Sequence, residues 1–440
     1  MDTLSEAAQL LLLAAQDLNL PTLRSILKSQ SPNVQDPTTL QTPLHLAILA
    51  CKGQSTNRPT NGASNGTTSP TSNGTSSIPN ITDELSLPPL LKAEKILPLL
   101  LQNGAIWNSL DTNNETPGCI ANRLKLTSLY DIMVDAGVRA ELLFGSLGDY
   151  MTLGGDDSEE EEEDDVEEVM DTDEVVDTTD IQKDDKGVLE DGEEVPELVP
   201  TERTALEKAG EEDIPVTSEE YLSSNLEIDD DKILDQDKNG VMMSWETSIM
   251  SQTVSLLLPP PSTNPKILNI GFGMGIIDSL FQSHQPSSHH IIEAHPQIIQ
   301  KLASHPISTT PGVVIHAGRW QDVLPKLVDE GTITFDAIYF DTFAEDYSQL
   351  KLFFTEYVIS LLEPNGHFGF FNGLGADRQI AYDVYKKVVE IDLLEAGLET
   401  EWHEVAVDSK KMEGEGEWKG VRRKYWDLEK YWLPVCKFIG

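Results

Sequence analysis

The chain has 440 residues, a length that suits about two to four domains. Its 31 Lys and Arg residues stand against 75 Asp and Glu residues, so the formal net charge is −44. This balance argues against a general nucleic-acid binder, which needs a basic surface to displace counterions from phosphates, and against docking on an anionic membrane. We therefore expect no direct nucleic-acid binding, no membrane association and a basic partner.

The negative charge is concentrated in one stretch. Between Asp156 and Glu197, 23 acidic residues stand against two lysines, a net charge of −21. Such a segment is too charged and too poor in apolar residues to bury a core. We predict an acidic disordered linker over 151–214, with a tail that binds a basic partner as the alternative.

Cysteine usage and apolar runs indicate an intracellular protein. Cys51, Cys119 and Cys436 lie far apart and include no CxxC pair, so the sequence offers neither a disulfide framework nor a zinc ribbon. The apolar run at 10–15 follows acidic residues instead of a basic segment, which is unlike a secretory signal. No window reaches the roughly 18 apolar residues of a membrane span.

Leu- and Ala-rich helical patterns occupy the first 150 residues. They predict helices at 4–16 and 22–29 and a third helix that ends in the segment 99–105. A tract of Asn, Gly, Ser and Thr at 53–83 predicts a flexible insertion. Thr42-Pro43-Leu44-His45-Leu46-Ala47 matches the opening of an ankyrin repeat, and Thr116-Pro117-Gly118-Cys119-Ile120-Ala121 keeps part of that pattern.

We therefore predict an all-α domain of two or three degenerate ankyrin repeats over 1–150. Stacked repeats of this kind offer a binding face and no chemistry. For His45 we expect a structural role in the turn next to it, not metal binding.

From about residue 215 short apolar strands alternate with helical segments, which is typical of a parallel sheet covered on both faces. The prediction is an α/β domain over 215–440 with a seven-strand sheet. Its strands are expected at 266–270, 291–292, 313–316, 335–340, 367–371 and 401–407, with a last antiparallel strand at 425–438 and helices at 347–362 and 376–394.

The first of these strands leads into Gly271-Phe272-Gly273-Met274-Gly275, and the next ends at Glu293. Glycines let a backbone approach a ligand closely, and an acid at the second strand tip accepts hydrogen bonds from a ribose diol. The spacing is GxGxG, not the GxGxxG of dinucleotide enzymes, which favours S-adenosylmethionine over NAD. An ordinary tight turn is the alternative.

Two later segments extend this site. Asp341 follows the strand at 335–340, whose tip points at the ligand crevice of such a sheet. Trp320 opens the helix after the third strand and can form a wall for an adenine ring. Its alternative role is plain core packing, because most tryptophans are packing residues.

Four segments together carry a resemblance: Val241–Met250, Gly271–Ile276, Ile291–Glu293 and Tyr339–Thr342. Over about 220–440 they are similar to guanidinoacetate methyltransferase. With degenerate ankyrin repeats in front, the chain resembles the type IV protein arginine N-methyltransferases of fungi and plants, which methylate the internal δ-nitrogen of arginine. The resemblance implies a Rossmann-like class I methyltransferase domain, a monomer in cytoplasm and nucleus, and protein substrates such as ribosomal proteins.

The resemblance also implies site residues. The implied cofactor contacts are Tyr221, Met250, Phe272, Gly273, Met274, Gly275, Ile276, Ile277, Glu293, Ala294, His295, Trp320, Gln321 and Asp341; the implied catalytic carboxylates are Glu246 and Asp341, with Met242, Glu246, Gly373 and Leu374 near the substrate. This chain departs from the small-molecule enzyme at His295, where that enzyme has Asn, and in the loop Phe343–Asp346.

The two carboxylates suit arginine chemistry. A guanidinium has a pKa above about 12 and stays protonated, and its N–H fork matches carboxylate geometry. In this hypothesis Asp341 and Glu246 align the nitrogen with the sulfonium methyl, and one of them takes the proton. The alternative for Glu246 is a helix cap or a surface acid.

No metal is expected. His284, His289, His290 and His295 do not show the HExxH spacing, and we expect exposed histidines in the loop before the second strand. Two other functions stay open at this point: methylation of a free guanidino metabolite, and an ankyrin scaffold that carries an inactive methyltransferase fold.

Overall fold

The computed structural model describes residues 4–53, 86–153, 216–331, 333–412, 414 and 416–440. The predicted flexible insertion, from residue 54 on, and the predicted acidic linker, from residue 154 on, lie outside the described residues. The described residues within 1–146 and 217–440 belong to one compact unit. None of the described helices combines the length and the apolar composition that a membrane crossing requires.

The N-terminal region is helical, as predicted. Its helices are α1 (Glu6–Gln16), α2 (Leu20–Ile26), α3 (Pro43–Leu49), α5 (Pro89–Gln102), α6 (Pro117–Arg123) and α7 (Thr127–Leu153). Thr42 and Thr116 cap α3 and α6, and each helix has proline at its first position, where the missing N–H is harmless. That these helices are ankyrin repeats stays a prediction.

His45 ties the two Thr-Pro turns together. Its Nδ1 lies 2.8 Å from Thr42 Oγ1, and its Nε2 lies 3.1 Å from the carbonyl oxygen of Glu115. The ring is fully buried, and burial lowers its pKa. These contacts agree with the structural role expected of this side chain.

The helices of the N-terminal region share a hydrophobic core with one face of α16 (Gln379–Glu395), which contributes Ile380, Val384 and Val388. The hydroxyl of Tyr130 also donates to Asp383 at 2.6 Å. The N-terminal helices therefore cover apolar surface of the α/β domain within the same compact unit.

The α/β domain contains the predicted seven-strand sheet, in the order β6-β5-β4-β7-β8-β10-β9. The strands are β4 (Lys266–Ile270), β5 (Ser288–Glu293), β6 (Val313–Ala317), β7 (Phe335–Phe340), β8 (Leu362–Phe370), β9 (Leu398–Ala406) and β10 (Lys430–Phe438). The ladders joining β6 through β8 are parallel, and β10 pairs antiparallel with both β8 and β9, which confirms the predicted last antiparallel strand.

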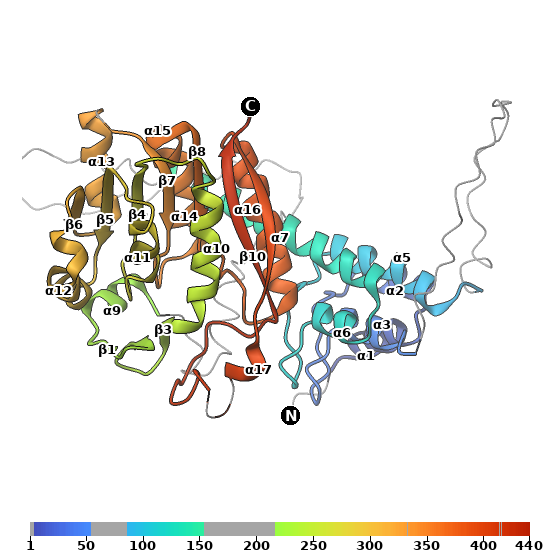
Figure 1. Ribbon diagram of the computed structural model, residues 1–440. Coiled ribbons are helices and arrows are strands. Elements are labelled where there is room, and N and C mark those ends of the chain that lie inside the picture. The colour runs from blue at the N-terminus through green and yellow to red at the C-terminus, as the bar shows by residue number, and fades with distance from the viewer. Residues whose placement is uncertain (1–3, 54–85, 154–215, 332, 413, 415) are drawn as a thin grey trace, which may run out of the picture. The chain divides into compact units, whose positions relative to one another are not determined.

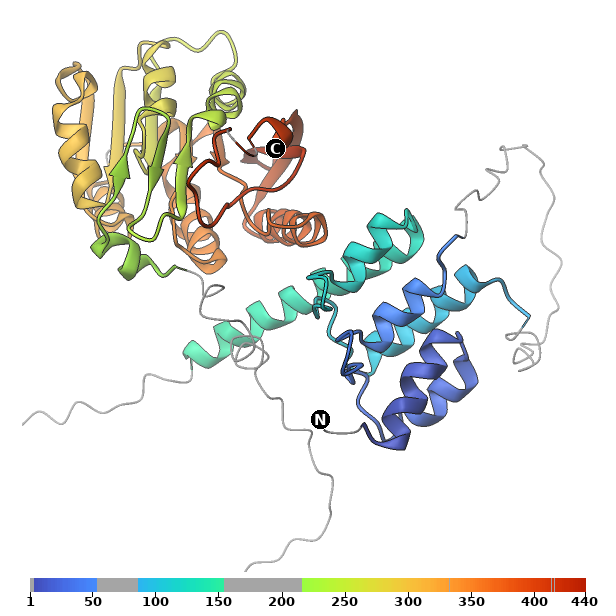
Figure 2. The ribbon, with the colours of Figure 1, turned by 90° about the horizontal axis from the view of Figure 1, so that it is seen from below.

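Helices cover both faces of this sheet (Figures 1 and 2). Successive strand residues point to opposite faces, so Ile267 and Tyr339 enter one core while Leu268 and Phe340 enter the other. The first core is closed by α10 (Thr247–Leu257), α11 (Ile276–Gln282) and α12 (Pro296–Ser304); the second by α13 (Trp320–Glu330), α14 (Tyr347–Leu352) and α16. This arrangement confirms the doubly covered α/β fold.

Some elements differ from the prediction. A small antiparallel sheet of β1 (Glu227–Ile228), β2 (Lys232–Leu234) and β3 (Gly240–Met243) was not predicted, because strands this short carry no readable alternation. The predicted helix at 347–362 contains a π-helical turn over Phe353–Val358, between α14 and α15 (Ile359–Leu361).

The expectation of exposed histidines before the second strand was wrong. The strand begins at Ser288, earlier than predicted, so His289 and His290 lie inside it and are buried. His289 Nε2 lies 3.0 Å from Asp278 Oδ1, and His290 Nδ1 lies 3.1 Å from His316 Nε2. Among the described residues no group of three or more His, Cys, Asp and Glu side chains has an arrangement suited to a metal ion.

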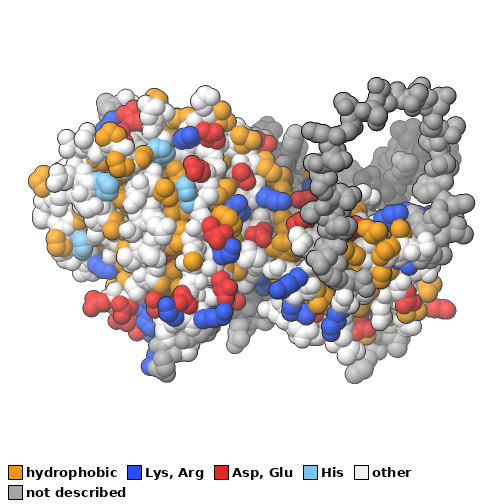
Figure 3. All heavy atoms as spheres, turned by 45° about the vertical axis from the view of Figure 1, so that its right-hand side comes forward, with side chains coloured by type: hydrophobic (Ala, Val, Ile, Leu, Met, Phe, Trp, Pro, Cys, Tyr) orange, Lys and Arg blue, Asp and Glu red, His pale blue; other side chains and the backbone are white. Residues whose placement is uncertain are grey.

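The surface charge is mixed. On the face presented in Figure 3, acidic and basic side chains are interspersed. Among the coloured side chains of that face, neither sign of charge gathers into one patch.

Candidate active site

A cavity of about 270 Å³ opens at the carboxyl ends of the central parallel strands. The strand ends are joined by backbone hydrogen bonds, from Gly271 N to the carbonyl of Ile292 at 2.8 Å and from Asp341 N to the carbonyl of Ile270 at 2.9 Å. The ends of β4, β5 and β7 therefore form one rigid floor, as the rule for open α/β sheets expects.

The glycine-rich turn after β4 passes very close to this floor. Gly271 has φ +91°, and a Cβ atom there would lie 2.0 Å from the carbonyl oxygen of Asp341. Gly273 has φ +51°, and its Cβ would lie 2.5 Å from Met242 Sδ. Because Gly271 combines a left-handed backbone with a close backbone oxygen, only glycine fits there. At Gly273 the left-handed backbone disfavours a side chain, but the near atom belongs to the flexible side chain of Met242.

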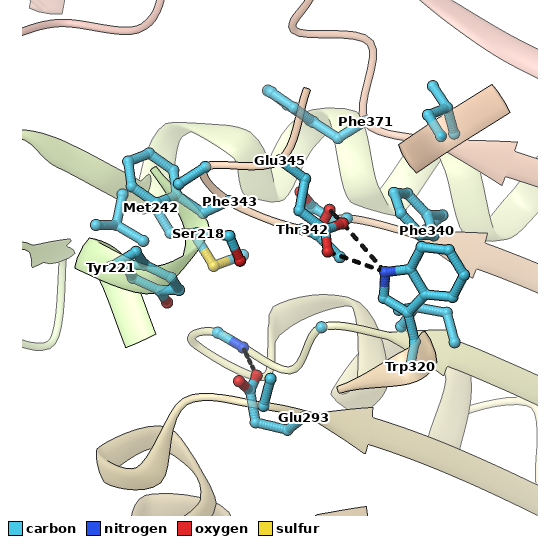
Figure 4. A pocket seen from close by; sticks show the side chains of 18 of the residues that line it. Ser218, Tyr221, Met242, Glu293, Trp320, Phe340, Thr342, Phe343, Glu345 and Phe371 are labelled. Atoms are coloured by element: carbon cyan, nitrogen blue, oxygen red, sulfur yellow. Dashed lines mark hydrogen bonds between the residues drawn. The ribbon is translucent and has the colours of Figure 1, made fainter. Parts of the chain in front are cut away.

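Glu293 ends β5 and is almost completely buried. Its carboxylate accepts hydrogen bonds from the backbone N–H of Phe272 at 2.8 Å and of His295 at 2.7 Å, and Gly273 N lies 3.4 Å away (Figure 4). Burial raises its pKa, while these amides oppose the rise. The position suits the ribose diol that the sequence predicts for it.

Glu246 reaches the cavity from the turn Ser244–Glu246, between β3 and α10, with 2% of its surface exposed. Met243 N donates to its Oε1 at 2.9 Å, and the hydroxyl of Tyr425 donates to the same oxygen. Oε2 is thereby left for a ligand. Burial raises the pKa of Glu246 to about 7, against the lowering effect of both hydrogen bonds.

Asp341 follows β7 directly and lines the same cavity. Although its side chain is partly open to the cavity, removal from bulk water and the nearby carboxylate of Glu246 raise its pKa well above the usual value. Within the described residues no cation lowers the pKa of either acid. The pair therefore forms a site where a positive charge would be strongly stabilised.

Apolar and aromatic side chains line the same cavity as the two acids, and Figure 4 labels several of them. Tyr221, on α9 (Ser218–Ser223), packs against Phe343 with ring centroids 5.0 Å apart, and Met242 and Phe371 line the cavity as well. Such walls suit the methylene stem of a long side chain whose head is charged.

Trp320 and Gln321 stand at the start of α13, after β6. Trp320 lines the cavity and also packs edge-on against Phe340 and Phe353 in the core, at 3% exposure. Its two predicted roles, wall and core residue, are compatible in this position.

Most of the predicted site residues come together here. Those that line the cavity are Tyr221, Met242, Glu246, Met250, Phe272, Gly273, Ile277, Glu293, Ala294, Trp320, Gln321, Asp341, Gly373 and Leu374. Four others, Met274, Gly275, Ile276 and His295, do not line it.

Two of these four residues, Met274 and His295, contact residues that line the cavity. Met274 N donates to Met242 Sδ at 3.2 Å, and His295 Nε2 lies 3.1 Å from the carbonyl oxygen of Tyr221. The sequence interpretation missed Tyr425, Phe371 and Glu345, which all line the cavity. The aromatic pair Tyr425-Trp426 was the only local signal for the first of them.

Comparison with known proteins identifies the family. Residues 217–430 match the family model of guanidinoacetate N-methyltransferase. Protein arginine N-methyltransferase 2 of Aspergillus fumigatus is 48% identical over 440 residues, covering 98% of this chain and 96% of that protein. The protein of the same name from Emericella nidulans is 46% identical over 437 residues, with the same coverage, and that from Saccharomyces cerevisiae is 36% identical over 365 residues, covering 80% of this chain and 81% of the relative. The chain therefore belongs to the fungal protein arginine N-methyltransferase 2 family and is an S-adenosylmethionine-dependent methyltransferase, as its sequence predicts.

Proposed function

We propose that this enzyme methylates the internal δ-nitrogen of an arginine residue in a protein substrate. The observation that carries the proposal is the pair of carboxylates, Glu246 and Asp341, which line one cavity and whose pKa values no cation of the described residues lowers. Arg319, a basic residue of the same lining, lies 3.8 Å from Glu219. Placing two such groups out of water is costly unless an opposite charge joins them. A guanidinium is the side-chain cation whose planar N–H fork two carboxylates can hold.

The residues of the cavity suggest how the reaction proceeds. Glu246 Oε2 and Asp341 accept hydrogen bonds from the terminal guanidinium nitrogens, and this grip leaves the internal nitrogen directed at the methyl donor. When bound, S-adenosylmethionine supplies a methyl group activated by a positive sulfonium. A carboxylate with a pKa near 7, as at Glu246, is suited to receive the proton that the nitrogen loses.

The chain's own residues fit the methyl donor. Glu293 provides the acceptor for a ribose diol, and the turn at Gly271 and Gly273 allows a ligand to lie against the backbone. Trp320 follows β6, Glu293 ends β5 and Asp341 follows β7, on the two sides of β4 in the sheet. This placement supports a nucleoside lying across the strand ends with its sulfur near the two acids.

A basic protein is the proposed substrate class, with ribosomal proteins as the group that the family resemblance suggests, and the cytoplasm and nucleus as the compartments. The formal charge of −44 supports attraction of a basic partner. The N-terminal helical region is proposed to recruit that partner, and the enzyme is proposed to act as a monomer.

The test is mass spectrometry of a fungal protein extract incubated with the full chain and isotope-labelled S-adenosylmethionine. Label on the internal nitrogen of peptidyl arginine supports the proposal, and its loss with Asp341→Asn links it to the cavity. Label on the terminal nitrogens would refute the δ-nitrogen assignment.

Free guanidinoacetate is the second acceptor to test, because the family model matched by residues 217–430 is named for it. Label only on that metabolite would show a small-molecule enzyme, and no label on either acceptor would favour a scaffold without catalysis. Glu356→Gln, which removes an exposed carboxylate away from the cavity, is the matched control.

A further inference from the structure

One acidic side chain of the cavity, Glu345, has no role in the reaction described above. It lies four residues beyond Asp341, and its carboxylate collects three different donors (Figure 4). Trp320 Nε1 lies 3.1 Å from both of its oxygens, Gln321 Nε2 donates at 2.9 Å and Thr342 Oγ1 donates at 2.7 Å. Glu345 therefore joins the start of α13 to the loop that follows β7.

The backbone before Glu345 is bent to make these contacts. Ala344 has φ +61°, a left-handed conformation that costs an L-residue about 1–2 kcal/mol. The hydrogen bonds of the Glu345 carboxylate offset that strain, because they hold the loop folded back toward the cavity. The loop conformation and the carboxylate thus support each other.

Glu345 also determines how Gln321 presents its amide. A carboxylate only accepts hydrogen bonds, so the amide nitrogen of Gln321 must face it, and this nitrogen also lies 3.0 Å from Gln349 Oε1. The indole N–H of Trp320 is held in the same way. Both side chains at this end of the cavity are therefore locked by one acid.

The carboxylate retains capacity for a ligand. Its two oxygens offer about four acceptor sites, and the protein supplies three donor groups. A base that lies beside Trp320 meets an anionic acceptor at its edge. An exocyclic amino group satisfies such an acceptor, whereas a carbonyl oxygen at the same position is repelled by it.

We propose that Glu345 is a specificity-determining residue of the cofactor site: it positions Trp320 and Gln321 and accepts the exocyclic amino group of the nucleobase, so that the pocket selects a 6-aminopurine over a 6-oxopurine. The proposal concerns recognition of the nucleoside and deepens the proposed function without requiring an arginine substrate. Its test measures binding with no methyl acceptor present, so its failure is distinguishable from a failure of the proposed reaction.

The experiment is calorimetric titration of the full chain with S-adenosylhomocysteine and with its deaminated counterpart, S-inosylhomocysteine. We expect the wild-type chain to bind the adenine compound at least about tenfold more tightly, the scale of one hydrogen bond to a charged acceptor. Glu345→Gln removes the negative charge and replaces one of the two acceptor oxygens by an N–H donor, and it should bring the ratio of the two affinities close to one. Glu356→Gln, an exposed change of the same charge, should leave the ratio unchanged.

A positioning role has its own readout. If Glu345 acts partly through Gln321, the effects of Glu345→Gln and Gln321→Ala on the adenine affinity should overlap in the double variant instead of adding. Equal weakening of both ligands by Glu345→Gln would show a structural role only. Equal affinity of the wild-type chain for the two ligands would overturn the proposal even if no variant folds.

Discussion

At the predicted cofactor end of the cavity, Glu293 is surrounded by backbone amides, whereas at the predicted substrate end Glu246 and Asp341 face each other with few donors. Glu293 accepts bonds from Phe272 and His295 that are part of the folded chain. Burial raises the pKa of all three acids, but at Glu293 several backbone amides oppose the rise, whereas at Asp341 the carboxylate of Glu246 adds to it. The first carboxylate is stabilised before any ligand arrives, and the second pair depends on its ligand for the same stabilisation.

This difference explains what each end can recognise. A carboxylate already held by amides accepts neutral hydroxyl donors and keeps a fixed orientation. Two buried carboxylates without a neighbouring positive charge favour a cationic donor, because only a cation offsets both the loss of hydration and the repulsion between the two negative charges. The five predictions below break or sharpen this contrast, from the largest expected effect to the smallest.

Removal of a charge at the substrate end should have the largest effect. We expect Asp341→Asn and Glu246→Gln each to lower kcat/KM for the arginine substrate about 10³-fold, because the guanidinium then loses one of the two carboxylates that hold and orient it. Glu246→Gln should leave S-adenosylhomocysteine affinity within a few fold. Methyl incorporation and calorimetry measure the two quantities.

In the unliganded protein, Glu246→Gln should raise the thermal stability, although it lowers the activity. The raised pKa of Glu246 means that its ionised form disfavours folding from about pH 4.5 upward, and the full penalty is present above pH 7. Glu246→Gln should therefore raise Tm at pH 8 and have little effect on Tm at pH 4.5. A lower Tm at pH 8 would contradict the uncompensated state of this acid.

The glycine-rich turn should be the next most sensitive feature. In Gly271→Ala the new methyl group meets the carbonyl oxygen of Asp341 at 2.0 Å, and the backbone of neither strand end can move aside. We expect a loss of about 3 kcal/mol in unfolding free energy, measured by urea denaturation. Gly397→Ala is the control: its φ of +85° is similar but no atom lies within 4 Å, so it should cost about 1 kcal/mol.

Substrate binding should depend on pH. Because a guanidinium binds the ionised acids and burial raises the pKa of Glu246 to about 7, kcat/KM should rise with pH below 7 and level off above it. The slope should approach about tenfold per pH unit for one proton released. A profile that is flat from pH 5.5 to 8 would show that Glu246 is ionised before the substrate binds.

Tyr425→Phe should produce the smallest change. The hydroxyl of Tyr425 donates to Glu246 and lowers its pKa, so its removal should move the rising part of the pH profile to higher pH. At pH 9 we expect a loss of only about three- to tenfold, the range of one hydrogen bond. An unchanged profile would mean that Met243 N alone holds Glu246 in its ionised form.

Much of the fold was predictable because its signals are local. The strand at 266–270, the glycine turn after it and the acid at the end of the next strand follow from apolar runs, turn chemistry and residue spacing. The start of β5 was misplaced, since polar residues such as His289 and His290 conceal a buried strand. The β1–β3 sheet was missed because each strand is too short to show a period.

The sequence by itself determined the chain order of most strands, the family and the acids Glu293 and Asp341 at two strand ends, because these depend on neighbouring residues and on segments with a distinctive pattern. Only the tertiary structure decided which side chains meet: Tyr425 reaches Glu246 across 179 residues, and Glu345 turns back to Trp320 through a left-handed Ala344. Such contacts depend on how distant segments pack and on side-chain direction, and no local pattern encodes either. The burial that raises the pKa values of Glu246 and Asp341 arises in the same way, when the surrounding segments close over them.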